Sequence, residues 1–595
     1  MKQISLLKKI NILFGKSELK ILGFLFLGMI LTGIFEIIGI GAIMPFMAVV
    51  IDPTIIHENI YISYIYNLLS LEDQDELVLF FGLSMMAVIL ISNISQILIN
   101  WGVIYFSNNQ SYKLSVKLLN RYLEQPYSFF LNKNTSEMTK NIISEVNRSM
   151  IGVVLQALVV VSKSVIIVFI CLLLAFIDPV VAVVSTGILL LSYTVIHKLV
   201  KNKVSSIGAA LTTANFLLYK TADEAMSAIK YIKLRGYEKK FSNFFHTPAK
   251  EISIYDTKSS LISIFPRYIL EIIVFGGMVV IVIINMRHSS HEVMSVVSLY
   301  ALSGYRIMPA MQAVYSGIIS IRYNLSAIDL LISDLSRKGV AINPEYNQAF
   351  VKFNKKLIID NVCFSYTGTE QLVLDCLNVE IEKNTTVGIV GVTGSGKTTL
   401  IDILLGLLSP NDGDVIVDGV KITEHNLKDW QKNVGYVPQS IYLMDDTIKQ
   451  NIVFGIADDR INHRQLRKVI EMTNLDSFIS TLPKKYETFI GERGVRLSGG
   501  QQQRIGIARA LYHNPEVLVL DEATSSLDNI TENAIMDAIH GLSHKKTIIM
   551  IAHRLSTIKK CDVIHVINNG QVVGSGSYEY LVANNKEFRD MAATM

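Results

Sequence analysis

The sequence predicts an α-helical membrane domain with six spans, followed by an α/β domain. Three features predict this architecture. Six long apolar stretches precede residue 332, and beyond them a glycine-rich loop lies between a strand pattern and a helix pattern at 387–407. A second short apolar run, Val517–Leu520, ends in two consecutive carboxylates. Strand patterns this short and this apolar are typical of a buried parallel sheet.

The composition agrees with a large membrane portion. Of 595 residues, 50% are hydrophobic and only 18% are charged. A chain of this length exceeds one domain, so we predict a membrane domain at 1–331, a polar linker at 332–349 and a second domain at 350–595. The net charge of +4 is too small to indicate a nucleic-acid partner, and none is predicted.

Each of the six apolar stretches is long enough to cross a bilayer, which takes roughly 20 helical residues. Buried helices of a soluble protein are the alternative, but several runs of this length in one chain disfavour that interpretation. The six predicted spans are about Ile21–Ile51, Leu77–Phe106, Ile151–Ile177, Val180–Val200, Leu261–Met286 and Val293–Ile321.

Lysine and arginine set the predicted orientation. The connection at 52–76 contains neither, whereas those at 107–150 and 198–258 are rich in both. By the positive-inside rule, the N-terminus, the second and fourth connections and the second domain are therefore cytoplasmic. Within these connections, Pro126–Glu137 and Asp223–Tyr231 are predicted to dock on the second domain, with ordinary helix connections as the alternative.

The glycine-rich loop reads GVTGSGKTT at Gly391–Thr399 and matches the phosphate-cradling pattern G-x-x-x-x-G-K-[ST]. An apolar strand, Val387–Val390, precedes it, and a helix pattern, Leu400–Leu407, follows. A glycine-rich turn alone is usually only a turn, but here the lysine, the hydroxyl, the strand and the helix all agree. We predict that the phosphate contacts come from Gly391, Thr393, Gly394, Ser395, Gly396, Lys397, Thr398 and Thr399, with the Thr398 hydroxyl also reaching Mg²⁺.

The run Val517–Leu520 ends in Asp521 and Glu522, at the strand end where open α/β sheets place their ligands. Asp521 is suited to hold Mg²⁺ through water, and Glu522 to polarise an attacking water. Upstream, Leu497–Gln501 reads LSGGQ and opens a helix pattern at Gln502–Tyr512. Exposed N–H groups at such a helix start favour a phosphate.

LSGGQ, the phosphate loop and the stretch DEATSSLD at Asp521–Asp528 together resemble the nucleotide-binding domain of ABC transporters, over about Phe350–Met595. The resemblance implies an ATP hydrolase with ATP and Mg²⁺ as cofactors. It further implies that Tyr366 stacks on adenine, that Gln439 touches Mg²⁺ and that His553 contacts the γ-phosphate. Taken singly, Tyr366 could be an ordinary strand aromatic and His553 a strand-end histidine. The implied nucleotide contacts also include Ser498, Gly499, Gly500, Gln501 and Asp528, and the implied metal set is Thr398, Gln439 and Asp521.

The six helices with long cytoplasmic extensions resemble the membrane domain of type I ABC exporters. One membrane domain and one ATPase domain make half of such a transporter. In this family the LSGGQ turn closes over the phosphate loop of the partner, so the resemblance implies a homodimer.

Charged residues inside the predicted spans are candidates for a substrate cavity. Arg267 and Glu271 stand at i,i+4 spacing and could pair on one helical face. One interpretation is a cavity that attracts an anion. The alternative is structural, with arginines pairing with Glu36 or Glu271 to lock helices. The candidate cavity residues are Glu36, Arg267, Glu271 and Arg306.

A narrower resemblance, to bacterial lipid-linked oligosaccharide flippases, rests on a glutamate and MPF at Met44–Phe46, Pro266-Arg267, YRIMP at Tyr305–Pro309 and GYVPQSIYL at Gly435–Leu443. It implies a basic outward-facing cavity for a pyrophosphate-oligosaccharide and a short external helix for a polyprenyl tail. The aromatic segment His57–Leu71 suits such a helix at the outer interface, or else a helix with no ligand role. Gln96, Gln312 and Ala313 depart from the pattern, because such cavities carry several arginines.

We therefore predict ATP-driven export or flipping of an amphipathic substrate across the bacterial inner (plasma) membrane, with a lipid-linked oligosaccharide as the substrate. A multidrug, lipid or peptide exporter of the same fold is the alternative within transport. An ATP-gated channel or regulator is disfavoured, since both sites of a homodimer would carry Glu522 and a complete signature. The four cysteines (Cys171, Cys363, Cys376 and Cys561) show no paired spacing, and no disulfide is expected.

Overall fold

The computed structural model describes residues 13–51, 59–68, 73–177, 179–285, 290–337, 351–369, 371–522, 536, 539, 541–551 and 555–594. The chain divides into two compact units. The helical unit comprises Met1–Gln125 and Asn132–Gly339, and the second unit comprises Pro126–Leu131 and Val340–Met595. Of the predicted docking segment Pro126–Glu137, residues Pro126–Leu131 group with the second unit and the rest with the first.

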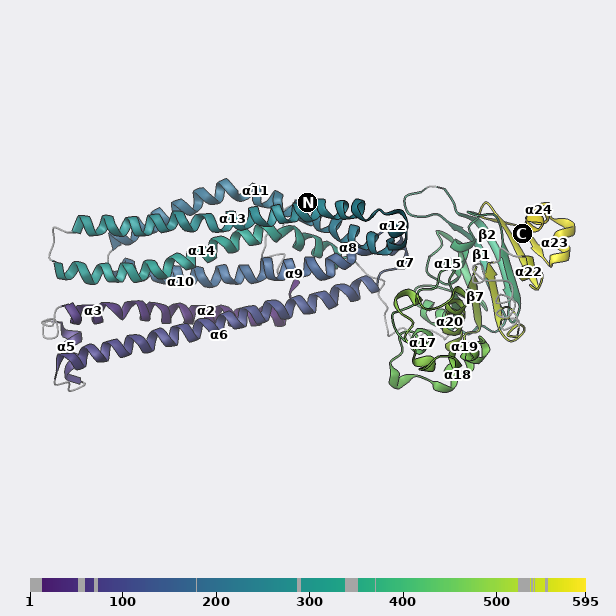
Figure 1. Ribbon diagram of the computed structural model, residues 1–595, viewed down its shortest axis with the longest axis horizontal. Coiled ribbons are helices and arrows are strands. Elements are labelled where there is room, and N and C mark those ends of the chain that lie inside the picture. Colours follow the sequence, from purple (N-terminus) through teal and green to yellow (C-terminus); the bar gives the residue numbers. More distant parts are fainter. Residues whose placement is uncertain are drawn as a thin grey trace. The chain divides into compact units, whose positions relative to one another are not determined.

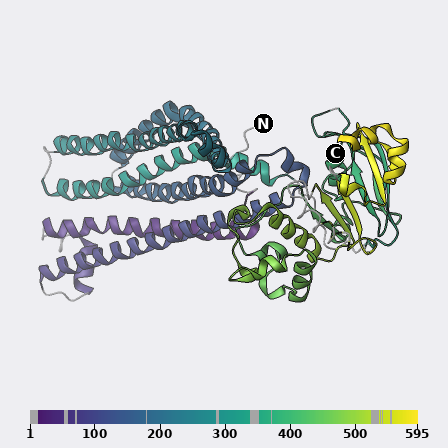
Figure 2. The same ribbon diagram turned by 45° about the vertical axis from the view of Figure 1, so that its right-hand side comes forward.

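Long helices build the first unit (Figure 1). Figures 1 and 2 show α10, α11, α13 and α14 side by side, while α2 runs along α6. The helices in chain order are α2 (Lys16–Gly41), α3 (Ile43–Ile51), α5 (Ile60–Leu68), α6 (Gln74–Leu123), α8 (Thr135–Lys140), the π-helix η1 (Asn141–Glu145), α9 (Val146–Ser149), the π-helix η2 (Met150–Leu155), α10 (Gln156–Ile177), α11 (Pro179–Ser227), α12 (Ile229–Arg235), α13 (Glu238–Asn285) and α14 (Ser290–Leu335), with α7 (Tyr127–Leu131) in the second unit.

Three helical stretches among the described residues are long and apolar enough to cross a membrane: Lys16–Val50, Asp75–Leu123 and Thr135–Ile177. They contain the second and third predicted spans and all of the first except Ile51. The other three predicted spans lie in α11, α13 and α14, where many side chains are outside the described part of the chain. Of the predicted external helix, α5 is described and shows a mostly exposed, aromatic surface.

The long helices extend well beyond the thickness of a bilayer. Helix α6 has 50 residues, which at 1.5 Å per residue is about 75 Å, against roughly 30 Å of hydrocarbon. Its polar end is held by buried contacts: the Tyr122 hydroxyl donates to Asp334 at 2.6 Å, and Asn141 donates to the same carboxylate at 3.0 Å. These contacts explain why α14 continues to Leu335, past the linker start predicted at 332. The domain boundaries at 331 and 350 otherwise stay predictions.

Within the described residues, two β-sheets form the frame of the second unit. One has six strands in the order β10-β9-β3-β8-β7-β6, with β9, β3, β8, β7 and β6 parallel, and the other has four antiparallel strands in the order β2-β1-β4-β5. The strands are β1 (Lys356–Phe364), β2 (Leu374–Glu382), β3 (Thr386–Val390), β4 (Asp412–Val417), β5 (Val420–Lys421), β6 (Val434–Val437), β7 (Val517–Asp521), β8 (Thr547–Ile551), β9 (Val563–Asn568) and β10 (Gln571–Gly576).

Short helices surround these sheets. They are α15 (Lys397–Leu404), α16 (Leu427–Lys432), α17 (Ile448–Val453), η3 (Asp458–Arg460), α18 (His463–Met472), α19 (Asp476–Ser480), η4 (Lys485–Glu487), η5 (Glu492–Gly494), α20 (Gly499–Tyr512), α22 (Leu555–Ile558), α23 (Tyr578–Asn584) and α24 (Lys586–Thr594).

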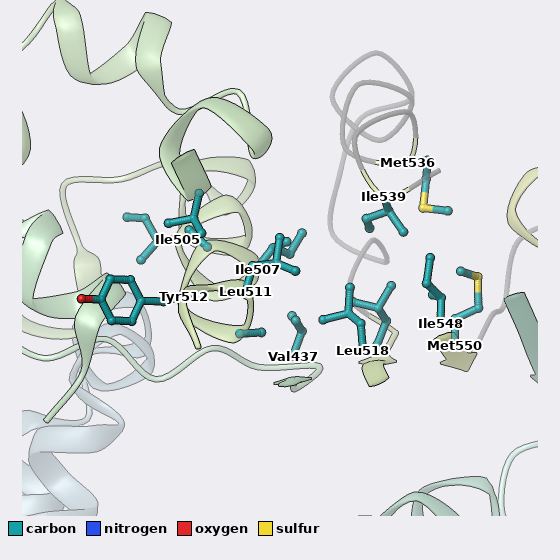
Figure 3. Packing of buried hydrophobic residues seen from close by; sticks show 14 of the residues in the cluster. Val437, Ile505, Ile507, Leu511, Tyr512, Leu518, Met536, Ile539, Ile548 and Met550 are labelled. Atoms are coloured by element: carbon teal, nitrogen blue, oxygen red, sulfur yellow. The ribbon is translucent and has the colours of Figure 1, made fainter. Parts of the chain in front are cut away.

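Strand β7 lies between β6 and β8, and all five of its residues are buried, as the apolar run predicted. Its side chains alternate between two cores: Leu518 and Leu520 belong to one cluster, Val517 and Val519 to the other. Figure 3 shows the first core, where Ile507 and Leu511 of α20 lie close to Leu518 of β7. This packing fixes the helix that follows LSGGQ against the strand that carries Asp521.

Candidate functional site

The phosphate loop, Gly391–Gly396, joins the end of β3 to the start of α15. At two of its glycines, any residue with a Cβ would be strained. A Cβ at Gly391 would lie 2.2 Å from the Ile567 carbonyl oxygen, and Gly396 has φ +100° as the N-cap of α15. The helix begins at Lys397, earlier than the predicted Leu400, so its free N–H groups point into the loop.

The Lys397 side chain folds back over this loop. Its ammonium donates to the carbonyl oxygens of Gly391 and Val392, each at 2.9 Å. Only 7% of the residue is exposed, and this burial lowers the pKa of the ammonium, while the carboxylates of Glu522 and Asp521 act in the opposite direction. The loop lysine and the strand-end carboxylates therefore share one electrostatic environment.

At the end of β7, each carboxylate has a neighbour from the β6 region. The Glu522 carboxylate accepts a hydrogen bond of 2.7 Å from Gln439, and Asp521 accepts one of 3.4 Å from the Tyr436 hydroxyl. Glu522 adopts φ +48°, a conformation uncommon for residues other than glycine. The strand thus turns sharply at the residue predicted to polarise water, and the turn brings it to Gln439.

The residues present fit a phosphate and a hard divalent cation. The Ser395 hydroxyl is buried, accepts or donates no hydrogen bond among the described residues, and would lie 2.6 Å from a Cβ at Gly391. An orphaned hydroxyl inside a ring of backbone N–H groups is suited to a phosphate oxygen. Thr398, Gln439 and Asp521 supply hydroxyl, amide and carboxylate oxygens, the ligand types that Mg²⁺ prefers.

Tyr366 lies in the hairpin between β1 and β2. Its ring packs edge-on against Phe364 at 5.1 Å between centroids, and its hydroxyl shares a 3.0 Å hydrogen bond with Thr399 of α15. This contact ties the predicted adenine-stacking residue to the helix that follows the phosphate loop.

The LSGGQ turn is a capped helix start. The Ser498 hydroxyl accepts from the Gln501 N–H at 3.3 Å, and the Gln501 side chain accepts from the Ser498 N–H at 2.9 Å. This reciprocal capping starts α20 at Gly499 instead of Gln502. Within the described part of the chain, no hydrogen bond or ion pair joins Leu497–Gln501 to Gly391–Thr399.

Ser498 caps α20 and is predicted to contact nucleotide, and replacing it by alanine should separate these two roles. Losing the cap should cost about 1 kcal/mol of stability. Ser577→Ala removes a comparable N-cap from α23, distant in sequence from every nucleotide motif, and serves as the matched control. We expect a similar fall in melting temperature for both variants and a large loss of ATPase activity for Ser498→Ala alone. Equal ATPase activity in the two variants would rule out the nucleotide role of Ser498.

Two predicted site residues, His553 and Asp528, lie outside the described residues, so their roles stay predictions. Of the four candidate cavity residues, Glu36 and Arg306 contact each other. Glu36, 3% exposed, accepts from Ser92 and Gln96 at 2.7 Å each and pairs with Arg306 at 3.0 Å. Arg306 therefore makes the contact that the structural alternative expected.

Arg267 and Glu271 behave differently. Arg267 of α13 is exposed, and among the described residues no ion pair joins it to Glu271. The i,i+4 spacing permits a pair that the described residues do not form. Because Gln96 bonds to Glu36, its position is polar and inward-facing although it carries no charge.

Sequence reasoning missed Ser92, and it also missed the approach of Cys363 to Cys376, whose sulfur atoms lie 2.9 Å apart.

Comparison with known families agrees with this geometry. Residues 16–311 match the family described as the ABC transporter transmembrane region, and residues 374–525 match the ABC transporter family. Both matches are to ABC transporter families, one over the helical region and the other over the region that holds the phosphate loop, the signature turn and the strand-end carboxylates. The chain belongs to the ABC transporters, and its fold is that of a bacterial ABC exporter.

Individual relatives extend the comparison. The ATP-dependent lipid A-core flippase of Haemophilus ducreyi is 41% identical over 40% of each chain, so that alignment spans less than half of the flippase. The ATP-dependent lipid A-core flippase of Haemophilus influenzae is 27% identical over 84% of this chain and 86% of its own. A solved structure of a bacterial Atm1-family ABC exporter with ATP bound has a TM-score of 0.78, 23% identity and coverage of 96% and 97%, and supports the fold.

Proposed function

We propose that two copies of this chain form a homodimer in the bacterial inner membrane and use ATP hydrolysis to export or flip an amphipathic, lipid-linked substrate. The observation that carries the proposal is that the carboxylates of Asp521 and Glu522, at the end of β7, act electrostatically on Lys397 of the phosphate loop. The other half of the chain contains helices long enough to cross a membrane. A catalytic ATPase joined to membrane helices is suited to active transport, and a complete Glu522 site disfavours a channel gated by ATP alone.

In the proposed chemistry, Lys397 and the loop N–H groups bind the β- and γ-phosphates. Thr398, Asp521 and Gln439 would hold Mg²⁺, which when bound offsets the negative charge of the phosphates. Glu522 orients and deprotonates the attacking water, and its bond to Gln439 holds the carboxylate at the end of β7. His553 steadies the γ-phosphate. Hydrolysis then needs no covalent intermediate on the protein, only positioning and charge.

The dimer is proposed because one chain carries one phosphate loop and one signature turn that are not joined to each other. Ser498, Gly500 and Gln501 would complete the partner's nucleotide site from across the interface. Closure on ATP and reopening after hydrolysis would move the two membrane units between inward- and outward-facing arrangements.

For the substrate, we propose a lipid-linked oligosaccharide. The ATP-dependent lipid A-core flippase of Haemophilus influenzae aligns with most of both chains, and its name supports a lipid substrate. The exposed Arg267 could take up an anionic group, since a guanidinium binds phosphate bidentately. Arg306 contributes less free charge to such a site, because Glu36 already pairs with it. A multidrug, plain-lipid or peptide exporter is the second candidate.

The two arginines should respond differently to removal. Arg306→Ala removes the guanidinium that pairs at 3.0 Å with the nearly inaccessible Glu36 carboxylate, and losing the ion-pair partner of a buried charge is costly. We expect a melting temperature lower by several degrees, largely restored in the double variant Glu36→Gln/Arg306→Ala. Arg267→Ala should leave melting unchanged but reduce flipping of a pyrophosphate-linked lipid, with basal ATPase retained. Normal transport in both single variants would rule out a substrate role for either arginine.

ATPase stimulation tests the substrate class. The ATPase rate of the purified protein is measured with lipid-linked oligosaccharide, a set of hydrophobic drugs and plain phospholipid added in turn. Glu522→Gln gives the background rate. Stimulation by the lipid-linked oligosaccharide above the other two supports the proposal. Stimulation by drugs alone favours the second candidate.

A further inference from the structure

Two cysteines that are 13 positions apart in the sequence meet in the four-stranded sheet. The Sγ atoms of Cys363 on β1 and Cys376 on β2 lie 2.9 Å apart, and both are free thiols. Cys376 is exposed and Cys363 half-buried, so small reagents can reach the pair. Of the other two cysteines, Cys561 is buried and Cys171 lies in helix α10.

The strand register places the two thiols opposite each other. Val362 pairs with Leu377, so continuing that register by one residue sets Cys363 against Cys376, at an irregularity of the ladder before Phe364. Directly opposed residues of an antiparallel pair have Cβ atoms about 4.5–5.5 Å apart, near the range a disulfide requires. Only a shift of less than about 1 Å separates the present sulfur contact from a covalent bond of roughly 2.05 Å.

Cys376 also has an unusual backbone. Its φ is +48°, a left-handed conformation that glycine, asparagine and aspartate adopt more readily than cysteine. The conformation turns the Cys376 side chain toward Cys363 at the point where the ladder is irregular. The hydrogen bond to Cys363 raises the pKa of the Cys376 thiol to about 11.

The pair closes the base of a hairpin that contacts the phosphate loop. Tyr366 lies within this hairpin and hydrogen-bonds Thr399. The β2 side of the hairpin lies against the phosphate loop: a Cβ at Gly396 of that loop would lie 2.8 Å from the Val373 carbonyl oxygen and 2.7 Å from the Leu374 side chain. Gly570 accepts from the Asp375 N–H at 3.0 Å and itself donates to Ser395 at 3.2 Å. Residues 373–375 therefore pack directly on the loop that would hold phosphate.

We propose that Cys363 and Cys376 form a reversible disulfide modification site that lowers ATP affinity when oxidised. The consequence for ATP rests on the proposed ATPase function and on the adenine-stacking role that the family resemblance implies for Tyr366. In a reducing cytosol such a bond would be transient, which is typical of redox-sensing thiols.

A small-molecule disulfide supplies the oxidising equivalents. The Cys363 thiolate attacks one sulfur of oxidised glutathione, forms a mixed disulfide and releases one glutathione thiolate, which takes up a proton. The Cys376 thiol then loses its proton and its thiolate attacks the Cys363 sulfur, releasing the second glutathione. In sum, two protein thiols are oxidised to one disulfide and one glutathione disulfide is reduced to two thiols.

Peptide mapping of the full-length protein tests the site. After incubation with oxidised glutathione and alkylation, we expect a cross-linked peptide joining Cys363 and Cys376 that dithiothreitol reverses. Cys376→Ser should stop at a glutathione adduct on Cys363, and Cys171→Ser, the matched control, should retain the cross-link. Separate adducts on the two cysteines of the wild type, or oxidation confined to other cysteines, would overturn the modification site.

Equilibrium binding of ATP tests the proposed effect of the Cys363–Cys376 disulfide on ATP affinity. Oxidation should raise the Kd of the wild type about five-fold or more, the lower range of what losing a base–aromatic stack costs, and leave Cys363→Ser unchanged. A cross-linked protein with an unaltered Kd would overturn the regulatory effect. Tyr366→Ala, measured under reducing conditions, separates the two proposals: an unchanged Kd there refutes the adenine role of Tyr366, while the peptide map still decides the disulfide.

Discussion

Glu522→Gln should bind ATP with near wild-type affinity and hydrolyse it about 10²–10⁴-fold more slowly. The amide has the shape of the carboxylate but cannot accept a proton from water. The phosphate cradle is untouched, because Lys397 contacts the carbonyl oxygens of its own loop. The variant should therefore remain closed on ATP as a dimer. Single-turnover phosphate release and size analysis in the presence of ATP measure both effects.

The same strand supplies the control. Glu516 immediately precedes β7 at its opposite end, where it pairs with Lys383 and Lys546. Glu516→Gln changes the same functional group without touching the proposed water site, so ATPase activity should stay close to wild type. Turnover near wild type in Glu522→Gln, or an equal loss in both variants, would show that Glu522 is not the catalytic base.

Lys397→Ala should weaken ATP binding itself. A hydrogen bond to a charged group contributes about 1.5–3 kcal/mol, so the loss of the ammonium should raise the Kd for ATP at least about ten-fold. The Lys397 ammonium lies inside the loop, where it is held by two loop carbonyl oxygens, so its charge acts directly on a bound phosphate. Equilibrium binding of ATP to the purified variant is the measurement.

Lys428→Ala is the matched control for this prediction. Lys428 is an exposed lysine of α16 whose ammonium donates to the Gln431 side chain of the same helix at 3.2 Å, and its removal should leave ATP affinity unchanged. If Lys397→Ala binds ATP as tightly as Lys428→Ala does, the backbone of the loop holds the phosphates without the lysine.

The nucleotide motifs could be predicted from the sequence because each is local. Strand, loop and helix follow one another within Thr386–Leu404, and Val517–Leu520 is short and wholly apolar. The predicted helix starts lie too late in the chain, although Ser498 and Gln501 carry the capping-box spacing that places the start of α20 at Gly499.

The remaining features depend on contacts between distant segments. The bond from Gln439 to Glu522 and the shared surroundings of Glu36, Ser92 and Arg306 arise when separate elements pack together, and no spacing in the sequence encodes them. The Cys363–Cys376 pair was likewise missed, because the irregular ladder of β1 and β2 hides their register.

Translocation in proteoliposomes tests the central proposal most directly. The purified chain is reconstituted with a fluorescent lipid-linked oligosaccharide, and the fraction that becomes accessible on the far leaflet is followed after ATP addition. The proposal predicts ATP-dependent movement in the wild type and none above background in Glu522→Gln. No movement of this substrate in wild-type vesicles that hydrolyse ATP and export a hydrophobic drug would contradict it.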